Sequence, residues 1–236
     1  MKRRVLVLLL TCFGLLLILQ GTGCHQLERW LGPKSVTTKE AYLDNPSGAK
    51  VDHSTLDAVV RRFVTEQGLV NYEMLRSEPE GLDRYITELA QVAFEPLPRD
   101  EKLALLINAY NAFTLRLILD HWPVESIRDI PKDQRWAAKR WDIGSIQLSL
   151  DEIEHEYLRK NFKEPRIHFA INCASLSCPP LRREAYKAAK ISQQLQDQAV
   201  RLHSDPGSCD LDSASQKLQL TRLYLWFEGD FEQASG

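Results

Sequence analysis

Hydrophobic residues recur at helical spacing where the folded part of the chain begins. Positions 56, 59, 60, 63 and 64 are apolar and form one helical stripe after Ser54, a residue type that caps helices. Gly68 supplies a stop. A second helix is expected over about 80–92, before two prolines interrupt the chain. The pattern therefore predicts two amphipathic helices at the start of the domain.

The most apolar stretch runs over about 100–121, with hydrophobic residues on nearly every face. Such a helix is expected to be buried all round. Asn108 and Asn111 interrupt it three positions apart, so they share a face. Buried amides need partners, because each one left unpaired costs about 1–3 kcal/mol. The two asparagines either tie this helix to neighbouring backbone or line a pocket.

Residues 141–148 alternate like a strand, and Ser149 with Glu152 fits a capping box that starts a helix. Glu154 falls inside the apolar arc of that helix, and His155 lies at its edge. A carboxylate in this position has to be paired or protonated.

Residues 166–173 alternate as a strand and run into a loop closed by two prolines. On a strand, Arg166, His168 and Asn172 share one face, whereas Cys173 faces the other side. His168 and Cys173 would then lie about 16 Å apart, too far for a nucleophile and its base. A Cys173 nucleophile would take its base from elsewhere, with His155 or His121 as candidates.

Cys173 and Cys178 have three competing interpretations. A disulfide between them is sterically feasible, a catalytic thiolate at Cys173 is possible, and so are two inert thiols. A metal site is disfavoured, because Cys-x4-Cys without a second ligand pair is a weak signature. Ser175 lies in the same loop without a nucleophile-elbow pattern and is expected to form loop hydrogen bonds. The sequence indicates no cofactor.

Glu154 and His168 are both polar groups in apolar surroundings. Since a lone buried carboxylate is costly, we expect Glu154 to bond His168 or Arg166 in one polar site beside the Cys173 loop. His168 would then be a general base oriented by Glu154, or a member of a structural pair.

The first 23 residues have the features of a secretory leader: three basic residues and then an apolar run up to position 19. Gly21-Thr22-Gly23-Cys24 indicates a lipoprotein cleavage site with acylation at Cys24, although Gly21 stands where such sites usually have Leu. The alternative is an uncleaved membrane anchor. We expect the mature chain to be held in the cell envelope by lipid at Cys24, at the outer membrane and facing the periplasm.

Charge excludes one class of partner. Loss of the leader reduces the 30 lysines and arginines to 27, against 32 acidic residues, so no basic excess suggests nucleic acid binding. Residues 24–51 are polar and without pattern, which indicates a tether. Residues 52–236 then form one domain.

Several segments together resemble the domain of unknown function 547 (DUF547) family, in its bacterial lipoprotein-type form. They are EKLALLINAYNAFTLRLIL (101–119), SIRDI (126–130), GSIQLSLDEIEHEYLR (144–159), PRIHFAINCASLSCPPLRR (165–183) and LYLWFEGDF (223–231). The resemblance covers roughly 52–231 and implies no particular activity.

We expect an α+β domain in which several helices, including the buried helix over 100–121, pack on a small sheet containing 166–173. The leading functional interpretation is a cysteine-dependent hydrolase or transferase acting on a periplasmic substrate. The alternative is a non-catalytic lipoprotein that binds a ligand or protein partner through a polar pocket.

Overall fold

The structure is a computed structural model that describes residues 32–175 and 178–235. Its first half contains α2 (Ser54–Phe63), α3 (Tyr72–Ser77), α4 (Glu80–Leu89), α5 (Arg99–Asp120), η1 (Ile127–Asp129), β1 (Trp141–Ile143) and β2 (Ile146–Leu148). Next come α6 (Leu150–Glu152), the π-helical η2 (Ile153–Leu158), α7 (Arg159–Asn161), η3 (Pro165–Phe169), η4 (Ala188–Lys190) and α8 (Ile191–His203). The hairpin of β3 (Cys209–Asp212) and β4 (Lys217–Leu220), then α9 (Leu223–Trp226) and α10 (Glu228–Ser235), complete the described chain. The prediction of an α+β domain is confirmed.

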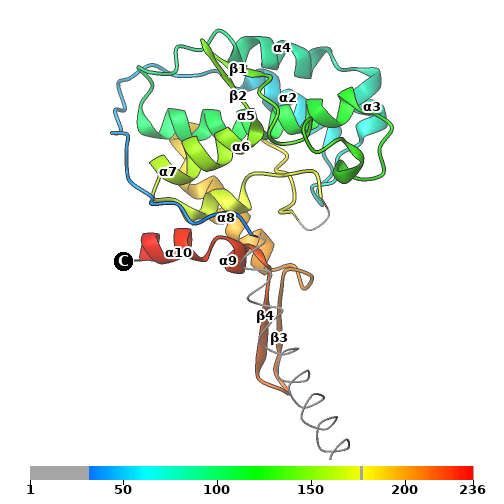
Figure 1. Cartoon of the computed structure of the whole chain (residues 1–236), viewed down its shortest axis with the longest axis vertical. Coiled ribbons are helices and arrows are strands. Elements are labelled where there is room, and N and C mark those ends of the chain that lie inside the picture. Colours follow the sequence, from blue (N-terminus) through cyan, green and yellow to red (C-terminus); the bar gives the residue numbers. More distant parts are fainter. Residues whose placement is uncertain (1–31, 176–177, 236) are drawn as a thin grey trace, which may run out of the picture.

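Helix α5 is the centre of the molecule, as its all-round apolar sequence predicts (Figure 1). It contacts α4, α6, η2 and α8. Its length and composition would allow it to cross a membrane, but 89% of its most apolar stretch of residues is buried inside the protein. Even Lys102 is buried, with its Nζ donating to the Glu95 carbonyl at 2.9 Å and lying 4.2 Å from the centre of the Tyr42 ring. Helix α5 is therefore the core helix of this domain.

Asn108 ties α5 to the chain after the cysteine loop. Its Nδ2 donates to the Tyr186 carbonyl at 2.8 Å, and its Oδ1 accepts from the Tyr186 amide at 2.9 Å. Asn111 does the same one turn later, donating to the Ala170 carbonyl at 3.0 Å and accepting from the Asn172 amide at 2.8 Å. Of the two interpretations of these asparagines, the structure supports the tie to neighbouring backbone.

The prediction of a strand over 166–173 is wrong. Residues 165–169 form the 3-10 helix η3, with Pro165 in its first turn and the Glu164 side chain accepting from the Arg166 amide. The backbone after η3 bonds to the Asn111 side chain, which takes the place of a neighbouring strand. The predicted division of Arg166, His168 and Asn172 from Cys173 on opposite strand faces therefore does not apply.

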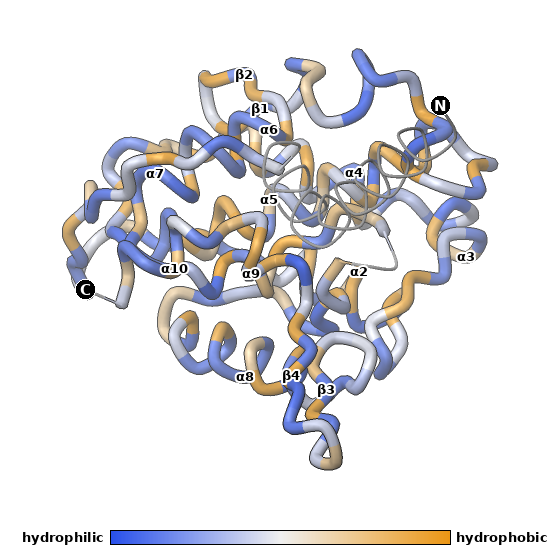
Figure 2. The backbone as a smooth tube through the Cα atoms, turned by 60° about the horizontal axis from the view of Figure 1, so that its bottom comes forward, coloured by the Kyte–Doolittle hydropathy of each residue, from blue (hydrophilic) through white to orange (hydrophobic). Residues whose placement is uncertain are grey.

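Two antiparallel hairpins supply the strands of the described chain. Residues 141–148 form β1 and β2 around Gly144, which has a φ of +58° and packs so close to the Val92 carbonyl that a Cβ would lie 2.3 Å from it. The hairpin β3–β4 extends away from the body of the protein and carries both hydrophobic and hydrophilic positions (Figures 1 and 2). Leu211 pairs with Leu218, and both are more than half exposed.

The start of α6 follows its predicted capping box. The Ser149 hydroxyl accepts from the Glu152 amide, and the Glu152 carboxylate accepts from the Ser149 amide. In helix α2, by contrast, His53 occupies the N-cap position without a side-chain capping hydrogen bond, and Ser54, the predicted cap, is the first residue of the helix. The chain then continues through η2 into α7, which places Glu154 and His155 beside α5.

The described part of the expected tether, residues 32–51, packs against the domain. The Lys39 and Ala41 amides donate to the carbonyls of Lys160 and Asn161 at 2.9 and 3.0 Å. The Tyr42 ring lies 5.2 Å from that of Phe162. Backbone hydrogen bonds and aromatic packing therefore hold this segment on the domain.

Candidate functional site

A cavity of about 440 Å³ lies where α5, η2, the cysteine loop and α9 meet. Its walls are largely apolar and are formed by Gly32, Pro33, Tyr110, Trp136, Asp151, Glu154, His155, His168, Ile171, Cys173, Cys178, Pro179, Arg222, Leu223, Trp226 and Phe227. All four candidate catalytic residues from the sequence, Glu154, His155, His168 and Cys173, line this cavity. Aromatic rings and titratable groups thus line the same cavity.

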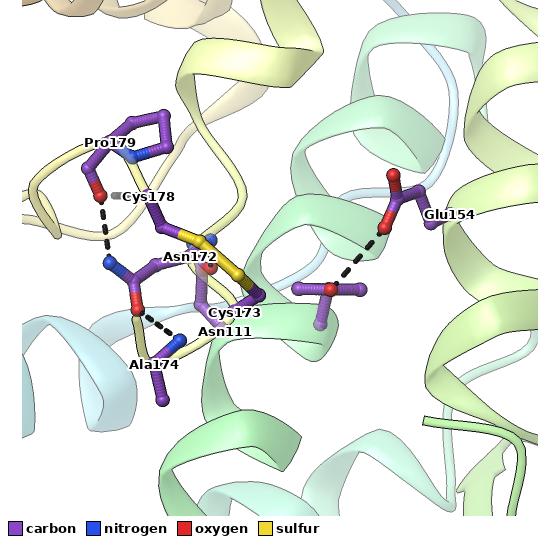
Figure 3. The surroundings of a disulfide bond; sticks show 8 residues. Asn111, Glu154, Asn172, Cys173, Ala174, Cys178 and Pro179 are labelled. Carbon is purple, nitrogen blue, oxygen red and sulfur yellow. Dashed lines mark hydrogen bonds between the residues drawn. A yellow bond between two sulfur atoms is a disulfide. The ribbon is translucent and has the colours of Figure 1, made fainter. Parts of the chain in front are cut away.

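Cys173 and Cys178 form a disulfide with a Cα–Cα distance of 6.1 Å. Asn172 fixes the loop around it, since its Nδ2 donates to the Pro179 carbonyl at 2.7 Å and its Oδ1 accepts from the Ala174 amide at 2.8 Å (Figure 3). A sulfur in a disulfide has no thiolate form. The predicted Cys173 nucleophile is therefore absent in this oxidised state, and the predicted disulfide is present.

Glu154 projects from η2 toward the cavity with a side chain only 14% exposed. Its Oε2 accepts a hydrogen bond of 3.3 Å from the Tyr110 hydroxyl of α5, drawn in Figure 3 as the dashed line to Glu154. Burial raises the pKa of Glu154 to about 7, against the opposing attraction of the Arg159 guanidinium. This carboxyl therefore changes its charge near neutral pH.

The expected pairing of Glu154 with His168 or Arg166 is wrong. His168 Nε2 bonds Asp230 Oδ2 of α10 at 2.9 Å, and Arg166 forms its ion pair with Glu164 at 2.6 Å. Burial lowers the pKa of His168, although Asp230 opposes this shift. Burial by itself would raise the pKa of Asp230, but the bonds from His168 and Arg159 outweigh it and keep that pKa below its usual value.

These two pKa shifts determine which ring nitrogen of His168 carries the proton. An ionised Asp230 can only accept, so Nε2 of the neutral imidazole carries the proton and Nδ1 keeps a lone pair. Nδ1 has no hydrogen-bond partner within the part of the chain that the structure describes. The Trp136 Nε1 is likewise buried without a partner there. Both side chains line the cavity.

Arg159 connects Asp230 and His155. Its Nε and one terminal nitrogen donate to the two oxygens of Asp230 at 2.6 and 3.0 Å, and the guanidinium lies 4.9 Å from the Phe227 ring centre. Its other terminal nitrogen lies 3.2 Å from His155 Nδ1. Burial, and then the nearby Arg159, lower the pKa of His155 to about 4. His155 is therefore neutral at physiological pH.

The remaining candidates lie outside this cavity. Asn108 and Asn111 tie α5 to neighbouring backbone, and Arg166 forms its ion pair with Glu164. Asn172 and Ser175 line a separate hollow that shares Cys178 with the main cavity. The predicted pocket role of these residues stays a prediction. His121 caps the end of α5, and Cys24 lies outside the described residues.

Sequence reasoning missed Asp230, Arg159 and Tyr110. Asp230 had one available signal, a carboxylate within the aromatic run 224–231, where an unpaired charge is unfavourable. Among the described residues, no group of three His, Cys, Asp or Glu side chains is placed to hold a metal ion.

Residues 94–201 match the DUF547 family model. That family is described as "Protein of unknown function, DUF547", and the match supports the resemblance seen in the sequence. The searches of curated proteins and of solved structures found no match. The DUF547 match includes Glu154, His155 and His168, whereas Asp230 and the aromatic wall of α9 lie beyond it.

Proposed function

We propose that this chain is a cell-envelope lipoprotein of the DUF547 type that binds a small, largely apolar ligand in the cavity between α5 and α9. The observation that carries the proposal is the cavity itself. Its volume of about 440 Å³ suits a small molecule, and a few polar groups interrupt an aromatic wall. The disulfide favours binding over cysteine chemistry, because it occupies both loop thiols.

The lipoprotein part of the proposal rests on the leader and on Cys24. Gly32 and Pro33 lie on the cavity wall. Gly32 follows Cys24 by about eight residues, which span at most roughly 28 Å when fully extended. An acylated Cys24 would therefore keep the cavity close to the membrane surface, at the outer membrane and facing the periplasm in our proposal. Ligands that partition between membrane and water suit this placement.

Binding is tested with the neutral fluorophore prodan, whose emission rises in an apolar site. We expect saturable binding of one prodan per chain. Trp136→Ala removes an aromatic wall and should weaken binding about tenfold, as expected for about 1.4 kcal/mol of lost contact. Trp122→Ala is the matched control, because Trp122 packs on Tyr72 and does not line the cavity. Absence of saturable binding, or equal loss in both variants, would contradict the proposal.

A second candidate function is a hydrolase or transferase in which Cys173 acts after reduction. The observation in its favour is the Asp230–His168 hydrogen bond, which has the arrangement of a base and its orienting carboxylate. A reduced Cys173 would face the same cavity as His168 and Glu154. The redox state of Cys173 in the native protein separates this candidate from the first.

A further inference from the structure

We propose that the ligand of this cavity carries an ammonium group, which takes the place of a proton on Glu154. This inference rests on the proposed binding function and names the chemical class of its ligand. A cation of this kind would be enclosed by carboxyl groups, aromatic faces and a lone-pair acceptor, all contributed by residues of the cavity wall.

The first step of the argument is the excess of acidic groups. Asp151 and Glu154 both line the cavity, one turn apart in the chain, and burial raises the pKa of each. A buried carboxyl gains most from a partner that restores its charge, and an organic cation supplies one inside the cavity.

The second step is the acceptor on His168. Its side chain is fully buried, its Nε2 is used by Asp230, and its Nδ1 has no partner in the described chain. A bare imidazole nitrogen accepts hydrogen bonds and does not donate them. An ammonium group has only donors, so it pairs with the Glu154 carboxylate, and the described chain leaves His168 Nδ1 as a further acceptor on a residue of the same wall.

The third step is the aromatic wall. Tyr110, Trp136 and Trp226 line the same space. The Phe227 ring also lines it, but it is already stacked on His168 at 3.6 Å and lies 4.9 Å from the Arg159 guanidinium. Aromatic faces attract cations, by about 2 kcal/mol or more when the cation is desolvated. They also hold the apolar body of an amphipathic amine. A neutral ligand would gain the apolar contact and lose the electrostatic one.

Other charged groups surround Glu154 and bear on its titration. The Arg159 guanidinium of α7 favours its ionised form, whereas Asp151 and Asp230 disfavour it. His155 Nδ1 lies 3.8 Å from Glu154 Oε1 and is neutral above pH 5. Arg159 is already held by both oxygens of Asp230. Because Asp230 already balances the charge of Arg159, Glu154 can pair with a second cation.

Arg222 also lines the cavity and is engaged in interactions of its own. It is the group that would favour an anionic ligand instead, so a carboxylate ligand has to be one arm of the test.

Binding exchanges one cation for another. The protonated Glu154 releases its proton to solvent, and the carboxylate formed then pairs with the incoming ammonium. Affinity should therefore rise with pH up to the pKa of Glu154 and level off above it. With that pKa at about 7, binding at pH 5.5 should be about 25-fold weaker than at pH 7.5.

The experiment measures displacement of prodan from the full chain by hexylammonium, hexanol and hexanoate at pH 5.5 and 7.5. We expect hexylammonium to bind best and to show the pH dependence alone. Glu154→Gln should lose about tenfold in hexylammonium affinity at pH 7.5, measured relative to the hexanol affinity of the same variant, and should lose the pH dependence. Glu156→Gln is the matched control, since Glu156 is half exposed and pairs with Lys160.

Calorimetry on the unmodified chain gives an independent readout. At pH 6, in two buffers of different ionisation enthalpy, hexylammonium binding should release about one proton per ligand. If prodan binds but hexanol or hexanoate displaces it as well as hexylammonium does, the ammonium proposal is overturned while the binding function stands. If prodan itself does not bind, the proposed function fails.

The ammonium could belong to a free amine or to a lipid headgroup. Soluble dihexanoyl phosphatidylethanolamine, with dihexanoyl phosphatidylglycerol as control, distinguishes these sources. Displacement by the first lipid alone assigns the ammonium to a headgroup, and displacement by neither assigns it to a free amine. Displacement by both lipids alike would overturn the charge selectivity.

Discussion

Asp230 is a buried carboxylate that depends on two neighbouring side chains for its hydrogen bonds. It is 5% exposed and accepts from His168 and from two nitrogens of Arg159. Removing one partner of a buried ion pair leaves the other charge uncompensated, which is more costly than the pair is stabilising. Asp230 therefore holds both His168 and Arg159 in place.

We expect Asp230→Asn to lower the free energy of unfolding by about 3–5 kcal/mol at pH 7, because Arg159 loses its charged partner. Since the pKa of Asp230 is lowered in the folded state, its contribution is complete above the unfolded value of 3.8. It is lost as pH falls through the folded value. The variant should therefore lose less stability to acid than the original chain. Urea denaturation at several pH values measures this.

Asp210→Asn is the control for Asp230, because Asp210 is exposed on the β3–β4 hairpin and should change stability by less than about 0.5 kcal/mol. An equal effect of both substitutions would show that the Asp230 network does not support the fold.

Ionisation of Glu154 has the opposite effect on stability from ionisation of Asp230. Its pKa is raised in the folded state, so its ionisation opposes folding as pH rises from 4.5 toward about 7. A residue that destabilises the apo protein at neutral pH is typical of a binding site, where the ligand restores the lost interaction.

At the scale of elements, the cysteine loop decides between the two candidate functions. Asn172 bonds both ends of the loop and Asn111 bonds its start, so α5 and the loop hold Cys173 and Cys178 in place. The disulfide joins residues only five positions apart, and its sulfurs lie at the cavity wall.

We expect a thiol reagent applied to the folded, unreduced protein to label Cys209 and to leave Cys173 and Cys178 unlabelled. Cys209 is free and half-buried on β3, whereas the other two are joined. Peptide mapping by mass spectrometry identifies the labelled residue, and prior reduction is the control that should expose all three thiols. Labelling of Cys173 without reduction would favour the cysteine-dependent hydrolase or transferase.

At the scale of the whole molecule, the segment after Cys24 connects the proposed anchor to the cavity. The described part of this segment packs along α7 and α10: the Gln233 side chain donates to the Val36 carbonyl and accepts from the Thr38 amide, and the Lys39 amide donates to the Lys160 carbonyl. The chain from Cys24 to the cavity is therefore short and docked at its far end.

We expect Cys24→Ala to accumulate as a precursor that keeps its leader and incorporates no labelled fatty acid, because the lipid is attached to that thiol. Metabolic palmitate labelling and the mass of the purified chain measure this outcome. Cys209→Ala serves as control and should remain labelled. Normal lipid incorporation in Cys24→Ala would exclude the lipoprotein interpretation.

The sequence by itself determined the elements whose causes are local. Helix α5 is buried because apolar residues occupy nearly all of its faces. Helix α6 starts at Leu150 because Ser149 and Glu152 form a capping box within four residues of sequence. The placement of Glu154 in an apolar arc predicted a perturbed carboxyl, since that arc depends only on helical spacing.

Tertiary structure decided what depends on distant partners. Residues 165–169 became a 3-10 helix, and the backbone that follows found hydrogen bonds on Asn111, about sixty positions away. His168 found its carboxylate on Asp230, separated from it by 62 residues, and not on Glu154. Periodicity reports which face of an element is apolar, whereas the hydrogen-bond partner of a buried group depends on which elements pack against it.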